Sequence, residues 1–205
     1  GETPSEALAK RGVGYVELRA VDVNPYSPIG IDESSAGFLE VLALYCLLQD
    51  SPALLDDEQE QIEQNQAEVV NRGRAPNAHI VAEGQTYAIE DWCQKHVDAM
   101  RPFAELLDQA NATQLYVQAL ALMQQRIDEV DDTLSAQVIA DTLTHGGTWN
   151  FGSVMAQQHA AVYEQHQLSP ETQAYFDELA QTSLQQQQQL EQDSTVSFDE
   201  YLAHY

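Results

Sequence analysis

Two charged residues of opposite sign lie two positions apart near the start of the chain, in the stretch GYVELRAVDVNP at residues 14–25. The side chains of this stretch predict a β-strand that stops at an Asn-Pro turn. Because side chains alternate between the faces of a strand, Glu17 and Arg19 share a face with Tyr15, and lie roughly 7 Å apart along the backbone. The carboxylate could then bind a cation and the guanidinium an anionic oxygen. On an ordinary half-exposed strand, the same pair would be solvated surface charges.

The histidines do not suggest a metal site. None of the six has the spacing of a known ligand motif, and no HExxH or clustered Cys/His arrangement occurs. The sequence also lacks a GxSxG elbow and a Walker phosphate loop. These six residues are His79, His96, His145, His159, His166 and His204.

Two loops could in principle bind an anion. The backbone amides of residues 146–148, Gly-Gly-Thr, could face a phosphate, but two glycines here are more typical of a helix end followed by a new helix. Arg72 and Arg74 could reach an anionic ligand or an acidic neighbour, and in so acidic a chain we expect ion pairing within the protein.

The charge balance limits the kind of partner. The 205 residues include 33 acidic and 8 basic ones, for a formal net charge of -25. Such a surface repels nucleic acids and anionic membranes, so neither is expected as a partner. No apolar run is long enough to cross a bilayer, and two isolated cysteines, Cys46 and Cys93, fit the reducing cytoplasm.

The same charge predicts that stability depends on salt. Carboxylates repel one another across the surface, and added salt screens this repulsion. We expect the isolated chain to melt at a lower temperature in low salt than in high salt. Equal melting temperatures at the two ionic strengths would contradict this prediction.

The pattern of the chain predicts a mainly α fold: a helical body with one short strand near the N-terminus and at most a minor hairpin at residues 78–88. Pro102 is expected to kink or divide the helix that contains it. A helix starting at Ser34 or Ser35 and running to Leu48 is apolar nearly all round, which indicates a buried central position. The predicted helices are 3–11, 34–48, 56–71, 90–108, 114–129, 135–145, 150–166, 169–193 and a terminal one from Ser197. The first and the last are predicted to begin with capping boxes, Thr3–Glu6 and Ser197–Glu200, and Ser135 is predicted to cap the helix that starts there.

The order of residues in the first 32 positions carries a specific resemblance. The segments GETPSEAL at residues 1–8 and GYVELRAVDVNPYSPIGI at residues 14–31 closely resemble a late segment of the proteobacterial glutamate–cysteine ligases, also called γ-glutamylcysteine synthetases. Further along, the resemblance persists more weakly in the next apolar helix and in the Arg-Gly-Arg-x-Pro element at residues 72–76.

The resemblance implies an ATP-dependent carboxylate–amine ligase. Such enzymes phosphorylate the γ-carboxylate of glutamate, and the amine of cysteine then displaces the phosphate. By resemblance, Glu17 matches a magnesium ligand, Arg19 matches a catalytic, phosphate-contacting arginine, and Val13 and Tyr15 lie near the adenine of ATP.

The resemblance also implies that much of the enzyme is absent. Most of the magnesium carboxylates and the glutamate and cysteine pockets of this family lie on an earlier part of the chain. We therefore expect a C-terminal part that is inactive alone, with residues 1–33 as a remnant of the ATP-binding catalytic sheet and residues 34–205 as a helical region. Its expected partners are the missing N-terminal part, glutamate, cysteine and Mg²⁺-ATP. A non-catalytic, acidic and Gln-rich helical interaction module is the alternative.

Overall fold

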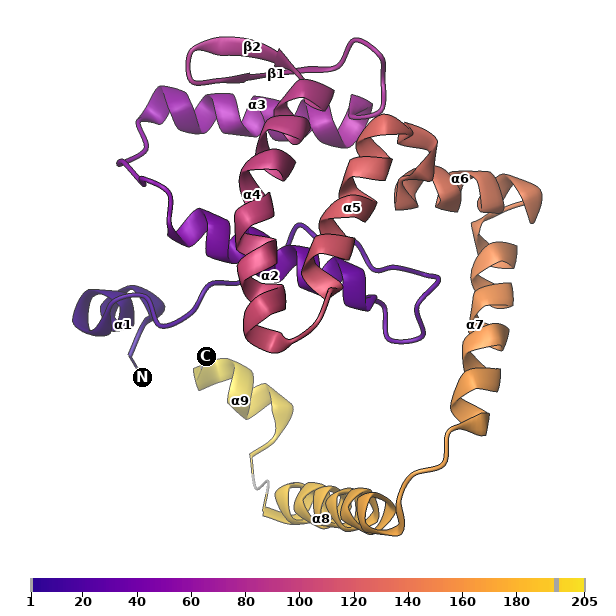
Figure 1. Ribbon diagram of the computed structural model, residues 1–205. Helices are drawn as coiled ribbons and strands as arrows, with labels where there is room; N and C mark the ends of the chain where they lie inside the picture. The colour runs from indigo at the N-terminus through magenta and orange to yellow at the C-terminus, as the bar shows by residue number, and fades with distance from the viewer. Residues whose placement is uncertain (1, 194–195, 205) are drawn as a thin grey trace. The chain divides into compact units, whose positions relative to one another are not determined.

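The computed structural model describes residues 2–193 and 196–204, and these are mainly helical, as predicted (Figure 1). Residues 1–156 and 157–205 form two separate compact units. The elements are α1 Pro4–Arg11, α2 Glu33–Leu47, α3 Asp56–Arg72, β1 His79–Ala82, β2 Gln85–Ala88, α4 Ile89–Asn111, α5 Leu115–Asp128, the 3₁₀ turn η1 Val130–Asp132, α6 Leu134–Thr144, α7 Thr148–Gln165, α8 Pro170–Asp193 and α9 Phe198–His204.

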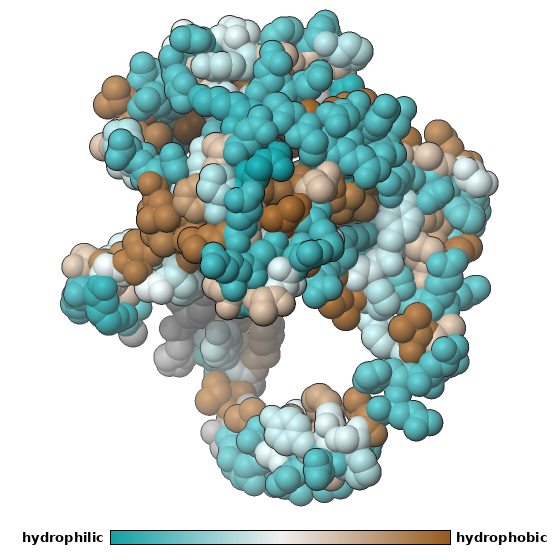
Figure 2. Space-filling model, in the orientation of Figure 1, coloured by the Kyte–Doolittle hydropathy of each residue, from teal (hydrophilic) through white to brown (hydrophobic). Residues whose placement is uncertain are grey.

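Helices α2, α4 and α5 pack together around the core of the first unit (Figure 1). Val41 and Ala104 are fully buried, and Gly37 lets α5 approach closely, because a Cβ there would lie 3.1 Å from the side chain of Leu115. The central position predicted for α2 is confirmed. Its burial is incomplete, since Leu47 at the end of the helix is 77% exposed. Figure 2 shows hydrophobic side chains on the surface near this end of α2.

Two helix starts differ from the prediction. Asp32 caps α2 in place of Ser34 or Ser35, because its Oδ1 accepts from the Ser35 amide at 2.6 Å. Thr133 caps α6 in place of Ser135, and its hydroxyl accepts from the Ala136 amide. In both cases the residue that caps lies just before the residue predicted, where its backbone is extended and its side chain can reach back to the first turn.

The minor hairpin is confirmed as an antiparallel pair, β1 with β2. Glu83 and Gly84 both have positive φ, which is the conformation of a tight type I′ turn. Asn65 of α3 joins this hairpin to the preceding helix: its amide donates to the Val81 carbonyl at 2.6 Å and accepts from the Val81 amide at 2.9 Å. The side-chain amide of Asn65 therefore imitates a strand neighbour and helps to hold a polar helix that has few apolar residues.

Pro102 was predicted to kink or divide its helix; α4 runs through it without a break, so division is wrong. The side chain of Pro102 is exposed, whereas Met100 and Ala104 on either side of it are buried in the core. The hydrogen bond that proline removes is lost on the solvent side, where water can replace it. Packing on the other side keeps the helix in one piece.

The strand predicted at residues 14–23 is wrong for this structure. Residues 12–23 have no regular secondary structure, and among the described residues only β1 and β2 pair in a sheet. A strand needs a neighbour to satisfy its backbone groups, and no described segment supplies one here. The apolar side chains of this segment are exposed as well, with Val16 at 78% and Leu18 at 53%.

The second unit, residues 157–205, contains the end of α7 together with α8 and α9. The predicted starts of α8 and α9 are confirmed: Ser169 accepts from the Thr172 amide, and Ser197 and Glu200 form a capping box. None of the described helices is long and apolar enough to span a membrane.

Candidate functional site

Glu17 and Arg19 lie side by side in the irregular segment of residues 12–23. Arg19 Nη2 lies 2.8 Å from Glu17 Oε2, so the two side chains are adjacent, although the strand on whose face they were predicted to lie does not form. The Arg19 side chain is 82% exposed and that of Glu17 is 55% exposed. An ion pair this exposed contributes little to stability, so a ligand can replace it at small cost. Because both side chains are exposed, both groups are accessible to a ligand.

Val13 and Tyr15 are the other two residues predicted for this site. Both are exposed, Val13 at 73% and Tyr15 at 82%. Among the described residues, no hydrogen bond joins Tyr15 to the Glu17–Arg19 pair. The structure therefore brings Glu17 and Arg19 together but does not show Val13 and Tyr15 joined to them.

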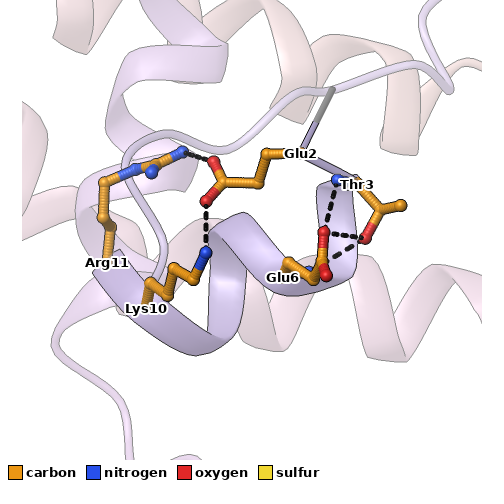
Figure 3. Close-up of polar contacts among 5 residues, drawn as sticks. All are labelled: Glu2, Thr3, Glu6, Lys10 and Arg11. Atoms are coloured by element: carbon orange, nitrogen blue, oxygen red, sulfur yellow. Dashed lines mark hydrogen bonds and ion pairs between the residues drawn. The ribbon is translucent and has the colours of Figure 1, made fainter.

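Helix α1 holds one end of this segment (Figure 3). Glu2 accepts from Lys10 at 3.0 Å and from Arg11 at 2.7 Å, and the hydrogen bonds from Arg11 and Lys10 lower its pKa. Thr3 and Glu6 form the predicted capping box, and Gly12, with φ of 72°, lets the chain leave the helix. These contacts satisfy both ends of a helix of only eight residues.

A compact turn holds the other end. The backbone amide of the buried Asn24 donates to the Gly30 carbonyl at 2.8 Å, closing the turn, and Ser27 Oγ donates to the Ile31 carbonyl at 2.6 Å. The Asn24 side chain spans the turn, because it donates to Asp32 at 2.7 Å and accepts from the Tyr26 amide at 3.0 Å. The residues that follow Arg19 therefore lead into a turn that these hydrogen bonds hold in place.

Tyr26 attaches this turn to helices much later in the sequence. Its hydroxyl donates to Asp141 of α6 at 2.7 Å, and its ring packs against Phe151 of α7 with centroids 6.0 Å apart. Burial, together with the nearby Asp141 carboxylate, raises the pKa of Tyr26 to about 12. The neutral phenol is thus the form that the fold stabilises.

A Tyr26→Phe variant tests this attachment. The pKa of Tyr26 rises from 10.0 to about 12 on folding, so its contribution to stability is complete below pH 10 and is lost as the pH rises from 10 towards 12. We expect the variant to be less stable than the parent chain near neutral pH, and the difference in the free energy of unfolding to become smaller above pH 10. Urea unfolding across this pH range measures this difference. A difference that does not change with pH would contradict the proposed hydrogen bond between Tyr26 and Asp141.

The two Arg residues of the 72–76 element behave differently. Arg72 pairs with Glu68 of α3 at 3.7 Å and donates to Asn77, which confirms the expected ion pairing. Arg74 forms no ion pair or hydrogen bond with any described residue, so the ion pairing expected for it is wrong. The residues Gly146 and Gly147 end α6, since the Gly147 amide donates to the Thr142 carbonyl at 2.8 Å, as expected for a helix end.

The segment can offer one carboxylate for a cation and one guanidinium fork for an anionic oxygen. Magnesium prefers oxygen ligands, and Oε1 of Glu17 is free of the ion pair, so the donor type fits. The described residues hold no group of three or more side chains suited to ligate a metal. The arrangement therefore fits one wall of a phosphate and metal site. No pattern in the sequence indicated that Asn24, Tyr26 and Asp141 hold the end of this segment, although the Asn-Pro dipeptide did predict a turn.

Comparison with known proteins identifies the wider context. The family model described as glutamate-cysteine ligase matches residues 1–69, which include Glu17 and Arg19. The glutamate–cysteine ligase of Pseudomonas putida is 38% identical over the whole chain, and that of Pseudomonas aeruginosa PAO1 is 36% identical. In both cases the chain spans 39% of the length of the relative.

A solved structure agrees with these relatives in fold. The crystal structure of the Francisella tularensis glutamate–cysteine ligase in complex with AMP superposes with a TM-score of 0.83 at 26% identity. The match covers all of this chain and 40% of that protein. Over its whole length, the chain is therefore similar to a part, about two fifths, of the glutamate–cysteine ligases of these bacteria.

Proposed function

We propose that this chain is part of an ATP-dependent ligase that joins glutamate to cysteine through γ-glutamyl phosphate, the first step of glutathione biosynthesis. The observation that supports it most directly is the match of the entire chain to glutamate–cysteine ligases, with the Glu17–Arg19 pair inside the region matched by the family model. No observation favours the non-catalytic interaction module over this function.

In the proposed reaction, Arg19 holds the phosphate oxygens of ATP. Its guanidinium donates two parallel hydrogen bonds to the phosphoryl group and stabilises the charge that develops during transfer. Arg19 is exposed and, among the described residues, contacts only Glu17 by an ion pair, so its guanidinium is able to turn to a ligand. Val13 and Tyr15 are proposed to lie near the adenine, with Tyr15 free to stack because its ring is exposed.

Glu17 is proposed as one ligand of Mg²⁺. The ion, when bound, would neutralise the crowded oxygens of the phosphates. Glu17 keeps Arg19 in position before ATP binds, and its second oxygen supplies the hard donor that magnesium prefers. One carboxylate is not sufficient for such a site, so the remaining ligands and the glutamate and cysteine pockets are assigned to the part of the enzyme that this chain does not contain.

The proposed division of the chain follows from these roles. Residues 1–33 are assigned to the catalytic half of the enzyme and residues 34–205 to its helical region. The reaction needs ATP and cysteine in its thiol form, so we assign the enzyme to the cytoplasm, where both are supplied.

A chimaera tests the function. The N-terminal segment of the Pseudomonas putida ligase that precedes the matched region is joined to this chain, and ADP release is measured with glutamate and cysteine present. We expect the chimaera to release ADP only when both amino acids are added, and the 205-residue chain alone to release none, because a complete phosphoryl-transfer site needs ligands from both parts. ATP-dependent synthesis of γ-glutamylcysteine by the isolated chain would contradict the division. A folded chimaera without activity would contradict the function.

A further inference from the structure

A partly open apolar cavity of about 690 Å³ lies within the first unit, away from the Glu17–Arg19 pair. Helices α2, α4 and α5 and the loop after α3 enclose it, and none of residues 12–32 lines it. Its walls are mostly apolar, which suits the burial of a small organic molecule. The main apolar side chains are Phe38, Leu42, Trp92, Met100, Met123 and Ile127.

Two arginines, Arg74 and Arg126, also line this cavity. They are the two basic residues that form no ion pair with any carboxylate in residues 2–193 or 196–204, although acidic residues outnumber basic ones by 33 to 8. The other six basic residues are each paired: Lys10 and Arg11 with Glu2, Arg19 with Glu17, Arg72 with Glu68, Lys95 with Glu83, and Arg101 with Asp98.

The guanidinium of Arg126 is also short of hydrogen-bond acceptors. Its Nε is buried and donates to no described atom, and its Nη1 has only the Met123 sulfur, at 3.9 Å. A buried donor without an acceptor is costly, and a charged one more so. In a chain with so many carboxylates, an arginine left in this state calls for an acceptor from outside the chain.

The charges around the cavity indicate a monoanion. Glu90 is the one acidic side chain of the lining, and it pairs with neither arginine. Two other titratable groups line the cavity and are neutral at pH 7: burial raises the pKa of the Cys93 thiol, and burial, with the charge of Lys95, lowers that of His96. Asp32 interacts electrostatically with Arg126 from outside the lining, and its oxygens already accept from Asn24 and Ser35. Among the lining residues alone, two cations and one anion leave a net charge of about +1, by simple count.

We propose that this cavity binds a small organic monocarboxylate with an apolar, aromatic or aliphatic body. Its body occupies the apolar walls, and its carboxylate accepts from the guanidinium groups of Arg126 and Arg74. A phosphate group fits less well, because its second charge would be left unmatched among apolar side chains. The inference does not depend on the proposed ligase activity.

The first experiment follows Trp92 as a reporter in the wall of the cavity. The chain has two tryptophans, and Trp149 is 85% exposed, so Trp149→Phe leaves Trp92 as the single emitter. We titrate this variant with 4-phenylbutyrate and with uncharged 4-phenylbutyramide, which has nearly the same shape. We expect a saturable change in emission with the acid, and binding at least about tenfold weaker with the amide, because the charge-assisted hydrogen bonds are lost. Equal affinity for the two compounds, or no saturable change, would overturn the proposal.

Substitutions of the two arginines then test whether their charges bind the carboxylate. Arg126→Met and Arg74→Met keep side-chain length but remove the cation, and each should weaken binding of the acid at least about tenfold. Arg126→Lys retains a charge and should retain part of the affinity. The matched control is Arg101→Met, which removes an exposed, ion-paired arginine of α4 that does not line the cavity, and it should bind as the parent does. A loss as large in the control as in the two cavity variants would overturn the assignment.

Thiol protection gives an independent readout that needs no substitution. Cys93 lines the cavity, whereas Cys46 is exposed elsewhere on the chain. We expect 4-phenylbutyrate to slow the alkylation of Cys93 by iodoacetamide severalfold and to leave Cys46 unaffected, as measured by mass spectrometry. Binding detected by fluorescence without protection of Cys93 would place the ligand outside this cavity and overturn the proposal.

Discussion

Arg19→Ala is expected to lower kcat of the active chimaera by about 10²- to 10³-fold, the loss typical when a preorganised donor to developing charge is removed. The guanidinium is proposed to stabilise phosphoryl transfer more strongly in the transition state than in the bound ground state, so kcat should fall more than KM for ATP rises. Arg19→Lys keeps the charge but not the fork, and an intermediate rate is expected. The measurement is glutamate- and cysteine-dependent ADP release.

The exposure of Arg19 allows this test to separate a loss of activity from a loss of stability. Its side chain is 82% exposed and, within residues 2–193 and 196–204, it forms an ion pair with Glu17 alone, so its removal should leave the melting temperature nearly unchanged. The matched control is Arg11→Ala, which removes another exposed, ion-paired arginine eight residues earlier and should change kcat by less than about twofold. A folded Arg19→Ala chimaera with a nearly normal rate would contradict the proposed role.

Asp108→Ala is expected to lower the free energy of unfolding by about 3 kcal/mol, from the loss of two charge-assisted hydrogen bonds to buried backbone. Asp108 is buried near the end of α4, where its two oxygens accept from the amides of Tyr116 and Val117 at 3.0 and 2.9 Å. These amides belong to the first turn of α5, which has no side-chain cap of its own. The carboxylate therefore acts as a cap supplied by the preceding helix.

Two further variants provide comparisons for the free energy of unfolding of Asp108→Ala, measured by urea titration. Asp108→Asn keeps one acceptor oxygen and should cost about half as much as alanine, because one amide stays paired. Asp98→Ala removes an exposed aspartate of the same helix, and should cost less than about 0.5 kcal/mol. If Asp108→Ala were as mild as Asp98→Ala, the cap would be unimportant and α5 would be held by apolar packing alone.

Features that depend on a few neighbouring residues could be predicted from the sequence. The Thr3–Glu6 and Ser197–Glu200 capping boxes, the glycine end of α6 and the hairpin turn all form where they were predicted. Each involves groups within about six positions of one another, so the pattern contains both partners. The adjacency of Glu17 and Arg19 is also a local feature, because the two residues are two positions apart. The resemblance that gave these residues a proposed role likewise depends on a short stretch of sequence.

The proposed site could be predicted only in part, for a physical reason. A pattern of side chains indicates what a segment would do beside a suitable neighbour. It does not say that the neighbour is present. Residues 14–23 have the pattern of a strand, yet without a pairing partner among the described segments they remain irregular and exposed. Pro102 illustrates the reverse case, because packing of the residues around it preserves a helix that the local pattern would interrupt.

Local backbone and side-chain geometry accounts for the helical class, most helix ends, the hairpin and the adjacency of the acid and the guanidinium, so these features could be predicted from the sequence. Three further features appear only in the folded chain: Tyr26 donates to Asp141, Asp108 caps another helix, and Arg74 and Arg126, 52 positions apart, line one cavity without an ion-pair partner among the described residues. Such contacts depend on how helices pack, and packing brings together residues whose separation along the chain carries no periodic signal.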